Sequence, residues 1–337
     1  MKRVLVLAFV FLGIALAAPP GALVRFDQAW RLVDEFYWDT NHRGVDWEAV
    51  GVEYRERVAR AGSWDEVYRL LDRMYGELGD DHSRVLAPAE ARAALRGVLC
   101  LPLPFPADAP DSEAASGLDA ASESAPTTKP GGEADEGADD GSIDWGAFSS
   151  RELEDGIAYL RVPHLIDQGI ADAVVEAVRR FETLGVRGYV LDLRDNPGGL
   201  AVVMAEVAGV FMRGLPWRIV TRTKGVTPQP TLPFWGRPLT EKPLVVLING
   251  RVNSAAEGLA GALKRAGRAR LVGETTAGNT EVVLPYCFPD GGVAMLASGV
   301  LAPMGGATWE GRGVAPDVEV AGREIQLDRA IEQLKGN

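Results

Sequence analysis

The pattern of apolar and polar positions divides the chain into two parts. Between residues 23 and 95, apolar side chains recur at three- and four-residue steps, the spacing that places them on one face of a helix. The residues in these series include Phe26, Trp30, Leu32, Val33, Phe36, Trp64, Val67, Leu70, Leu71 and Met74. Ser63 precedes the second series and is a suitable helix N-cap, with Asp65 and Glu66 in the first turn. This part of the chain is therefore predicted to form a small N-terminal helical domain.

From Gly156 onward the pattern alternates between strands and helices. Apolar runs at 157–162, 188–193 and 243–248 have the length and composition of buried strands, and a helical pattern follows each of them. Repeated alternation of this kind predicts an α/β fold with a layered core, which we place at residues 150–325.

Two segments follow neither the helical pattern nor the α/β pattern. Residues 1–18 carry Lys2 and Arg3 before an apolar run and contain a small-residue cleavage site at 15–17, which predicts a secretory signal peptide. An uncleaved anchor is the alternative, although an apolar run of about fifteen residues is short for a membrane span. Residues 105–144 are rich in Ala, Ser, Gly, Pro and acidic residues, so they are predicted to form a flexible acidic insert.

The net charge of −12 is concentrated in this insert. Residues 107–142 hold ten Asp and Glu and one Lys, which leaves a net charge of −3 for the rest of the chain. The sequence has no stripe of basic residues that could follow a phosphate backbone, which argues against a nucleic-acid partner. The two cysteines, Cys100 and Cys287, form no CxxC or Cys/His cluster, so no metal site is expected. They could pair as a disulfide in an oxidising compartment or remain separate thiols.

Two motifs carry candidate chemistry. In the first, an apolar strand ends at Asp195-Asn196-Pro197 and enters a helix through Gly198 and Gly199. Glycines let a backbone approach a ligand closely, and free N–H groups at a helix N-terminus favour an anion. The arrangement suits an oxyanion hole, but a Gly-Gly turn between strand and helix is also a common structural device.

In the second motif, the strand at 245–248 is followed by a loop, and Ser254 then begins a helix of small residues. Serine is a preferred N-cap, so a capping role is the structural alternative. A nucleophile at this place would gain from the helix dipole, and the Ala255 N–H could help to hold the oxyanion of an acyl intermediate.

These motifs are followed by Arg-Leu-Val-Gly-Glu-Thr-Thr-Ala-Gly at 270–278 and Gly-Val-Ala-Pro-Asp at 313–317. In this order they resemble the C-terminal processing, or tail-specific, serine peptidase family, closely over residues 156–320 and more loosely over the helical region. The resemblance implies a layered core like those of crotonase and the Clp proteases. It also implies that Ser254 attacks a peptide carbonyl, while Gly198 or Gly199 and Ala255 supply the oxyanion donors.

The sequence departs from the commoner branch of that family, which uses a Ser-Lys dyad. The lysine is expected 25 residues after Ser254, where this chain has Asn279, and a supporting glutamine is expected where it has Val283. Lys264, ten residues along the same helix as the serine, is expected to be solvated rather than to act as the base.

A second branch, similar to the tricorn protease core and its retinoid-binding-like relatives, uses a serine, a histidine and a glutamate. Residues 78–83, Leu-Gly-Asp-Asp-His-Ser, resemble its histidine motif and contain His82; Glu310 stands just before the 313–317 segment, as its glutamate does. A neutral imidazole can take the hydroxyl proton and return it to the leaving amine. The resemblance implies catalysis by Ser254, His82 and Glu310, with Glu310 orienting His82 directly or through a hydroxyl.

Other groups remain as alternatives. Glu257 and Glu274 are further carboxylates near the serine, and His164 is a rival base, although each could be structural. The space before the core is too short for the PDZ domain that many relatives carry, and the acidic insert could be a spacer or could gate the cleft.

The sequence therefore predicts an exported serine endopeptidase or C-terminal processing peptidase that acts on peptides or unfolded proteins without a cofactor or metal. It is expected in the periplasm, the cell envelope or the extracellular space, without stable membrane insertion after signal cleavage, and its oligomeric state is open. One alternative is a non-catalytic binding protein on the same scaffold, favoured by the missing lysine. A crotonase-type enzyme for coenzyme A thioesters is the other, and export argues against it.

Overall fold

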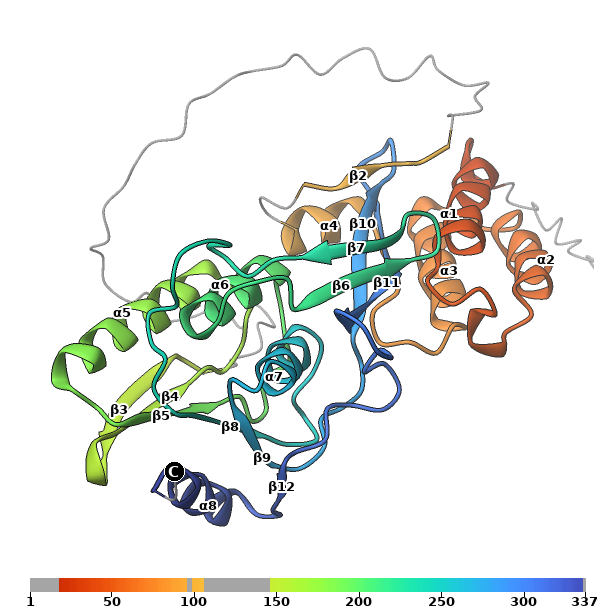
Figure 1. Ribbon diagram of the computed structural model, residues 1–337. Coiled ribbons are helices and arrows are strands. Elements are labelled where there is room, and N and C mark those ends of the chain that lie inside the picture. Colours follow the sequence, from red (N-terminus) through yellow and green to blue (C-terminus); the bar gives the residue numbers. More distant parts are fainter. Residues whose placement is uncertain (1–17, 96–98, 106–145, 336–337) are drawn as a thin grey trace, which may run out of the picture. The chain divides into compact units, whose positions relative to one another are not determined.

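The computed structural model describes residues 18–95, 99–105 and 146–335 (Figure 1). The chain forms two compact units. Unit 1 comprises the chain up to residue 107 with 221–225 and 283–299, and unit 2 comprises the remainder. Except for Ala18 and Phe105, the predicted signal peptide and the main part of the acidic insert lie outside the described residues.

Unit 1 contains the predicted helices. Its elements are α1 (Ala22–Phe36), the 3-10 turn η1 (His42–Gly44), α2 (Trp47–Val58), α3 (Trp64–Gly76), β1 (Arg84–Leu86), α4 (Pro88–Ala94) and β2 (Leu101–Pro102). The predicted cap of α3 is present, because the Ser63 Oγ accepts the Glu66 N–H at 3.2 Å. The apolar faces of α1, α2 and α3 meet in one core, and Tyr286, Phe288 and Leu296 from the second half of the chain complete it.

A disulfide joins Cys100 to Cys287, with the two Cα atoms 5.6 Å apart. Beside it, β2 pairs in parallel with β10 (Glu281–Cys287), so that Pro102 lies opposite Cys287. The structure thus selects the disulfide from the two states that the sequence left open. It links positions 187 residues apart within unit 1.

A buried ion pair also ties the first helix to the later segment of unit 1. The Arg25 Nη1 lies 2.5 Å from Asp290 Oδ1, and Arg25 is only 7% exposed. The Tyr68 hydroxyl donates to the same carboxylate at 2.7 Å. Burial alone would raise the pKa of Asp290, but Arg25, Tyr68 and the Gly292 N–H together hold it below its usual value.

Replacing Asp290 with asparagine should therefore lower the free energy of unfolding at pH 7 by about 1–2 kcal/mol, a figure reduced because the carboxylate is partly exposed. A lowered native pKa stabilises the fold above the unfolded-state pKa, and this contribution disappears as pH falls through the native pKa. Urea unfolding at pH 7 and pH 3 measures the effect, with the surface variant Asp27→Asn as control. An equal loss at both pH values would contradict a role for the charge.

Unit 2 has the predicted α/β architecture. Its first sheet has the order β12-β9-β8-β5-β4-β3, in which β3 is antiparallel to β4 and the other neighbours are parallel. The strands are β3 (Ser149–Leu153), β4 (Ile157–Arg161), β5 (Gly188–Asp192), β8 (Leu244–Ile248), β9 (Arg270–Gly273) and β12 (Val318–Glu319). The other elements are η2 (Glu154–Gly156), α5 (Gln168–Leu184), α6 (Ala201–Phe211), α7 (Ala255–Arg265) and α8 (Arg323–Lys335).

The two faces of this sheet bury alternate residues of the same strands. In β8, Val246 and Ile248 belong to the core under α5, α6 and α7, whereas Val245 and Leu247 face the core that contains Ala330 of α8. This period of two is what a parallel strand covered on both faces requires. Figure 1 shows α5, α6 and α7 on one side of the sheet and α8 on the other.

A second sheet has the order β2-β10-β11-β6-β7, and β1 pairs with β11 in antiparallel register. Its remaining strands are β6 (Trp217–Thr221), β7 (Gly225–Gln229) and β11 (Val293–Pro303). The chain passes from one unit to the other within these strands.

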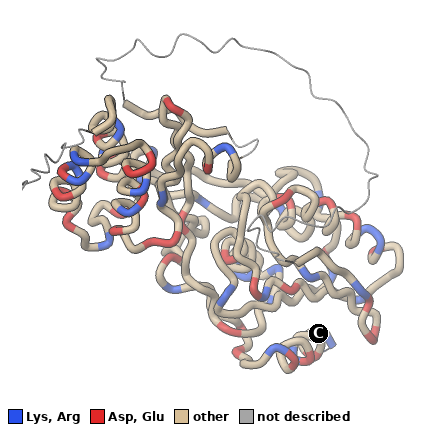
Figure 2. Tube along the Cα trace, turned by 180° about the vertical axis from the view of Figure 1, so that it is seen from behind, with Lys and Arg blue, Asp and Glu red and all other residues tan. Residues whose placement is uncertain are grey.

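Charged side chains of both signs are interspersed along both units (Figure 2), as is usual for solvated surface. Within the described ranges, none of the helices combines the length and apolarity that a membrane span needs.

Candidate active site

The two motifs meet because β5 and β8 are parallel neighbours. Leu191 lies opposite Val246 and Asp192 opposite Leu247, so the loops after both strands emerge at the same edge of the sheet. Parallel α/β sheets form their ligand sites at this edge. The sheet therefore places the loop at 193–200 beside the loop at 249–254.

Hydrogen bonds lock these two loops together. Asp195 N–H donates to Asn249 Oδ1 at 3.0 Å, and Asn249 Nδ2 donates back to Asp195 Oδ1 at 2.7 Å. Arg251 Nε adds a bond to the same oxygen at 2.8 Å. Burial opposes ionisation of Asp195, but these partners and Arg323 keep its pKa below the usual range. A charged Asp195 thus holds the loops in register.

Asn196 makes a second connection and was not singled out by the sequence. It is fully buried, and its Nδ2 donates to the Val162 carbonyl oxygen at 2.9 Å. Its Oδ1 accepts the Gly198 N–H at 2.8 Å, and its own carbonyl accepts the Asn253 N–H at 2.9 Å. One residue therefore fixes the end of β4 and the glycine turn through its side chain, and the residue before Ser254 through its main chain. Only its position in the charged turn before the glycines could have signalled this role.

Ser254 has a backbone conformation that a serine rarely adopts. Its φ and ψ are 52° and −122°, whereas an ordinary N-cap is extended. The Ser254 and Glu257 side chains form a capping box at the start of α7, and the Ser254 N–H donates to Asn279 O at 2.9 Å and to Glu257 Oε2 at 3.1 Å. Strain of the kind seen in the Ser254 backbone costs about 1–3 kcal/mol and is concentrated at functional sites. The strained backbone therefore favours a nucleophile, and the same residue also caps α7.

Gly198 and Gly199 lie next to this serine. A Cβ atom on Gly198, whose φ is 94°, would stand 2.7 Å from the Ser254 Cβ and 3.0 Å from the Ala255 nitrogen, so glycine is required. The Gly198 N–H is already donated to Asn196. By contrast, the N–H groups of Gly199 and Ala255 have no acceptor among the residues that the structure describes. The N–H groups of Gly199 and Ala255 are therefore available as backbone donors among the described residues.

Glu257, considered above as an alternative carboxylate, is fully buried and accepts four hydrogen bonds. Its Oε1 accepts from Thr276 Oγ1 at 2.5 Å and Gly278 N at 2.7 Å, and its Oε2 from Asn279 N at 2.9 Å as well as from Ser254 N. Burial raises its pKa, although the four hydrogen bonds act in the opposite direction. Because every bond holds backbone or a neighbouring hydroxyl, Glu257 positions Ser254 and the 276–279 loop.

Glu310 lies in the segment between β11 and β12 and contacts Thr280, which follows the 276–279 loop. Its Oε2 accepts the Thr280 N–H at 2.5 Å and the Thr280 hydroxyl at 3.2 Å. Thr280 directly follows Asn279, whose carbonyl accepts the Ser254 N–H, so two adjacent residues hold Glu310 and Ser254. Burial raises the pKa of Glu310, and the nearby carboxylates Glu281 and Glu257 raise it further.

Asn279 stands where the dyad lysine was expected. Its Oδ1 is buried and has no hydrogen-bond partner among the described residues, and the same is true of Asn253 Oδ1 on the other side of Ser254 along the chain. Lys264 is committed elsewhere, because its Nζ donates to Ala315 O at 2.7 Å and pairs with Asp317 at 3.0 Å.

His82 belongs to unit 1, whereas Ser254 belongs to unit 2, so their pairing is part of the proposal below. The His82 N–H donates to Asp80 Oδ1 at 2.9 Å, and the Ser83 N–H donates to the same atom at 2.5 Å. The Ser83 hydroxyl accepts the Ala297 N–H at 3.1 Å. These bonds fix the turn that carries the imidazole.

The remaining alternatives have structural surroundings. His164 lies after β4 and its Nδ1 accepts the Ile166 N–H at 3.4 Å. Glu274 is exposed at the end of β9. In the described part of the chain, no group of three His, Cys, Asp or Glu side chains could hold a metal ion.

Comparison with known proteins gives this site its class. Residues 156–320 match the model of peptidase family S41, and residues 23–76 match the tricorn protease C1 domain. A carboxyl-terminal-processing protease of Picosynechococcus sp. is 28% identical over 82% of this chain and 78% of its own length. A carboxy-terminal-processing protease of Bartonella bacilliformis is 32% identical, but the match spans 50% of this chain and only 39% of the relative.

A solved structure supports the fold. The photosystem II D1 C-terminal processing protease superposes with a TM-score of 0.62 at 22% identity, covering 90% of this chain and 94% of its own. The matches and the α/β core together define a serine-type peptidase. The chain carries a domain of peptidase family S41.

Proposed function

We propose that this protein is an exported serine peptidase that hydrolyses peptide bonds through an acyl-enzyme, with Ser254, His82 and Glu310 as its catalytic residues. The observation that carries the proposal is the strained backbone of Ser254, which lies against the Gly198–Gly199 turn, where the N–H groups of Gly199 and Ala255 have no acceptor among the described residues. A nucleophile and two convergent donors are the minimal parts of acyl transfer.

In the proposed reaction, the Ser254 Oγ attacks the carbonyl carbon while His82 accepts the hydroxyl proton. The negative charge on the carbonyl oxygen is stabilised by the Gly199 and Ala255 N–H groups. The intermediate expels the amine, which takes the proton from His82, and leaves an acyl group on Ser254. Water, deprotonated by His82, then attacks the acyl carbon; the bond to Ser254 Oγ breaks, His82 returns the proton to that oxygen, and the acid is released. Glu310 orients the imidazole, directly or through a hydroxyl such as that of Ser83.

A Ser-His-Glu mechanism accounts better for these residues than a Ser-Lys dyad. Asn279 has no basic group, and Lys264 is held by Ala315 and Asp317. With a pKa near neutrality, a histidine can exchange protons at physiological pH.

Export is proposed from two independent features. The first is the signal-peptide pattern of residues 1–18. The second is the Cys100–Cys287 disulfide, because stable disulfides belong to oxidising compartments. The substrate would then be a peptide or an unfolded protein of the periplasm, the cell envelope or the extracellular space, and we assign the acidic insert a spacer role.

Labelling with a fluorophosphonate probe tests the proposal, because this reagent modifies only an activated serine. Wild type should be labelled, Ser254→Ala and His82→Ala should not, and the control Lys264→Ala should react like wild type. Folded wild type that resists labelling would overturn the proposal. It would favour a non-catalytic binding protein, which the missing dyad lysine also permits.

A tighter test concerns the contact between the two loops. Gly198→Ala should lower kcat/KM for a peptide substrate by about 10²–10³, the usual effect of a misplaced oxyanion donor. The added methyl would meet Ser254 Cβ and, at 2.8 Å, the Asn253 carbonyl oxygen. Gly250→Ala in the neighbouring loop at 249–254 is the control, since its methyl would meet nothing closer than 3.7 Å. Similar activity of the two variants would contradict the close approach.

A further inference from the structure

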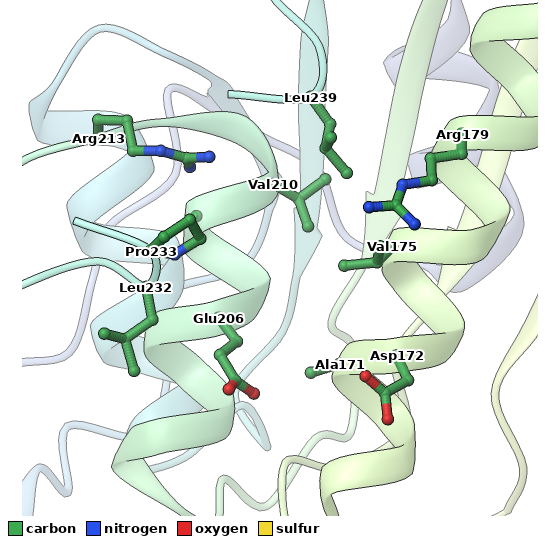
Figure 3. Close-up of a pocket in the computed structure, with 11 residues that line it drawn as sticks. Ala171, Asp172, Val175, Arg179, Glu206, Val210, Arg213, Leu232, Pro233 and Leu239 are labelled. Atoms are coloured by element: carbon green, nitrogen blue, oxygen red, sulfur yellow. The ribbon is translucent and has the colours of Figure 1, made fainter. Parts of the chain in front are cut away.

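A second cavity in unit 2 lies away from the residues assigned to catalysis. It has a volume of about 500 Å³ and lies between α5, α6 and the segment 232–239 (Figure 3). Apolar side chains such as Val175, Val210 and Leu239 line it. None of the proposed catalytic or oxyanion residues does.

The charges of this cavity are arranged in two pairs. Helix α5 contributes Asp172 and Arg179, and α6 with the residues just after it contributes Glu206 and Arg213. Each pair is separated by seven residues, which corresponds to about 10 Å along a helix. Figure 3 shows the two arginine side chains directed toward one another, with both carboxylates at the opposite end of the cavity. The cavity therefore has a cationic end and an anionic end with apolar walls between them.

Several of these charges are available to a ligand. Among the described residues, Asp172 and Arg179 have no ion pair and their side chains make no hydrogen bond, whereas Glu206 accepts one from Gln168 Nε2. Arg213 donates to three backbone carbonyls, those of Met212, Trp235 and Arg237, and has no carboxylate partner in the same ranges. Two of its five N–H groups thus remain for an acceptor.

The walls of the cavity are fixed by the backbone. Leu232 N–H donates to the Ala205 carbonyl at 2.8 Å, and Leu239 N–H donates to the Val210 carbonyl at 2.9 Å. Gly209 lies so close to Leu232 that a Cβ atom would stand 1.9 Å from its carbonyl oxygen. A ligand would enter a cavity that is already formed, which lowers the ordering cost of binding.

We propose that this cavity binds a short apolar peptide with free ends. The carboxylate would bind Arg179 and the free N–H groups of Arg213, and the amino group would lie near Asp172 and Glu206. An extended chain spans about 3.3–3.6 Å per residue, so three residues match the separation of the two ends. Binding at this cavity does not depend on the proposed catalytic function.

Isothermal titration of the full chain tests this inference. The probe is the tripeptide Ala-Val-Leu, compared with its C-terminal amide and its N-acetyl form, in a Ser254→Ala background that prevents cleavage. We expect saturable binding of one peptide per chain, weakened about tenfold by amidation or by Arg179→Met. Because amidation and Arg179→Met weaken the same contact and Arg213 remains, Arg179→Met should bind the acid and the amide with a smaller difference in affinity than the parent does.

The matched control is Arg180→Met, since Arg180 follows on the same helix but does not line the cavity. It should bind the free acid like the parent. Arg179 is exposed, and thermal unfolding checks that its variant folds. The inference would be overturned by equal affinity for acid and amide in the parent protein, by an unchanged affinity in Arg179→Met, or by no saturable binding up to the solubility of the peptide.

Discussion

Replacing Ser254 with alanine should lower kcat/KM for peptide hydrolysis by about 10⁴–10⁶, and replacing His82 should lower it nearly as much. The reason is that neither group works alone: the hydroxyl is a weak nucleophile without a base, and the imidazole has nothing to activate without the hydroxyl. The double variant should therefore be no slower than the slower single variant. Glu310→Gln should have a smaller effect, about 10²–10⁴, because it acts through the imidazole.

Steady-state kinetics on a fluorogenic peptide, with active-site titration, measures these differences. His164→Ala is the matched control, because it removes a histidine of unit 2 that the proposal does not use. His82→Ala with more than a tenth of wild-type activity would show that His82 is not the base. Multiplicative losses in the double variant would show that the two residues act independently.

The second large effect is expected on stability. Glu257→Gln should lower the free energy of unfolding by about 3–5 kcal/mol, because a buried set of four donors loses its acceptor. The carboxylate accepts with both oxygens, whereas a glutamine would turn an NH₂ group toward two of the donors. The N-terminus of α7 and Asn279 would then lose their common anchor.

Denaturant unfolding measures this loss, and Glu274→Gln is its control. Glu274 is exposed on the same segment, so its variant should remain within about 0.5 kcal/mol of wild type. Labelling of Ser254 should also slow in Glu257→Gln even where the protein is folded, because Glu257 accepts the Ser254 N–H. A Glu257→Gln variant as stable as wild type would show that the four hydrogen bonds of Glu257 are unnecessary for stability.

Local patterns were enough to predict the α/β core. The strand at 244–248 reads as a continuous apolar run because helices cover both of its faces, and the structure confirms the fold class that this run indicated. The same patterns could not predict which core the residues at 283–299 would enter. Periodicity reports which face of an element is apolar, but not the partner that will cover it.

The site shows the same limit at the level of single groups. Motif order was sufficient to direct attention to Ser254, the two glycines and Glu310, and the structure places all four in unit 2. There Gly198 lies against Ser254, Ser254 is bonded to Asn279, and Glu310 is bonded to Thr280. The motif order could not predict which glycine N–H stays free, because that depends on the orientation of the Asn196 amide. Nor could the motif order reveal that Glu257 holds four donors from two separate segments, Ser254 and the loop at 276–279.

The long-range completion of the unit 1 core has a consequence for biosynthesis. The helices that end at Gly76 leave the ribosome long before Tyr286 and Leu296, which cover their apolar faces. At typical translation speeds the interval between Cys100 and Cys287, 187 residues, lasts about 10–40 s. During that time the core of unit 1 lacks the side chains that complete it, and part of the apolar surface of its helices stays uncovered. This core can therefore close only after most of the chain has been made.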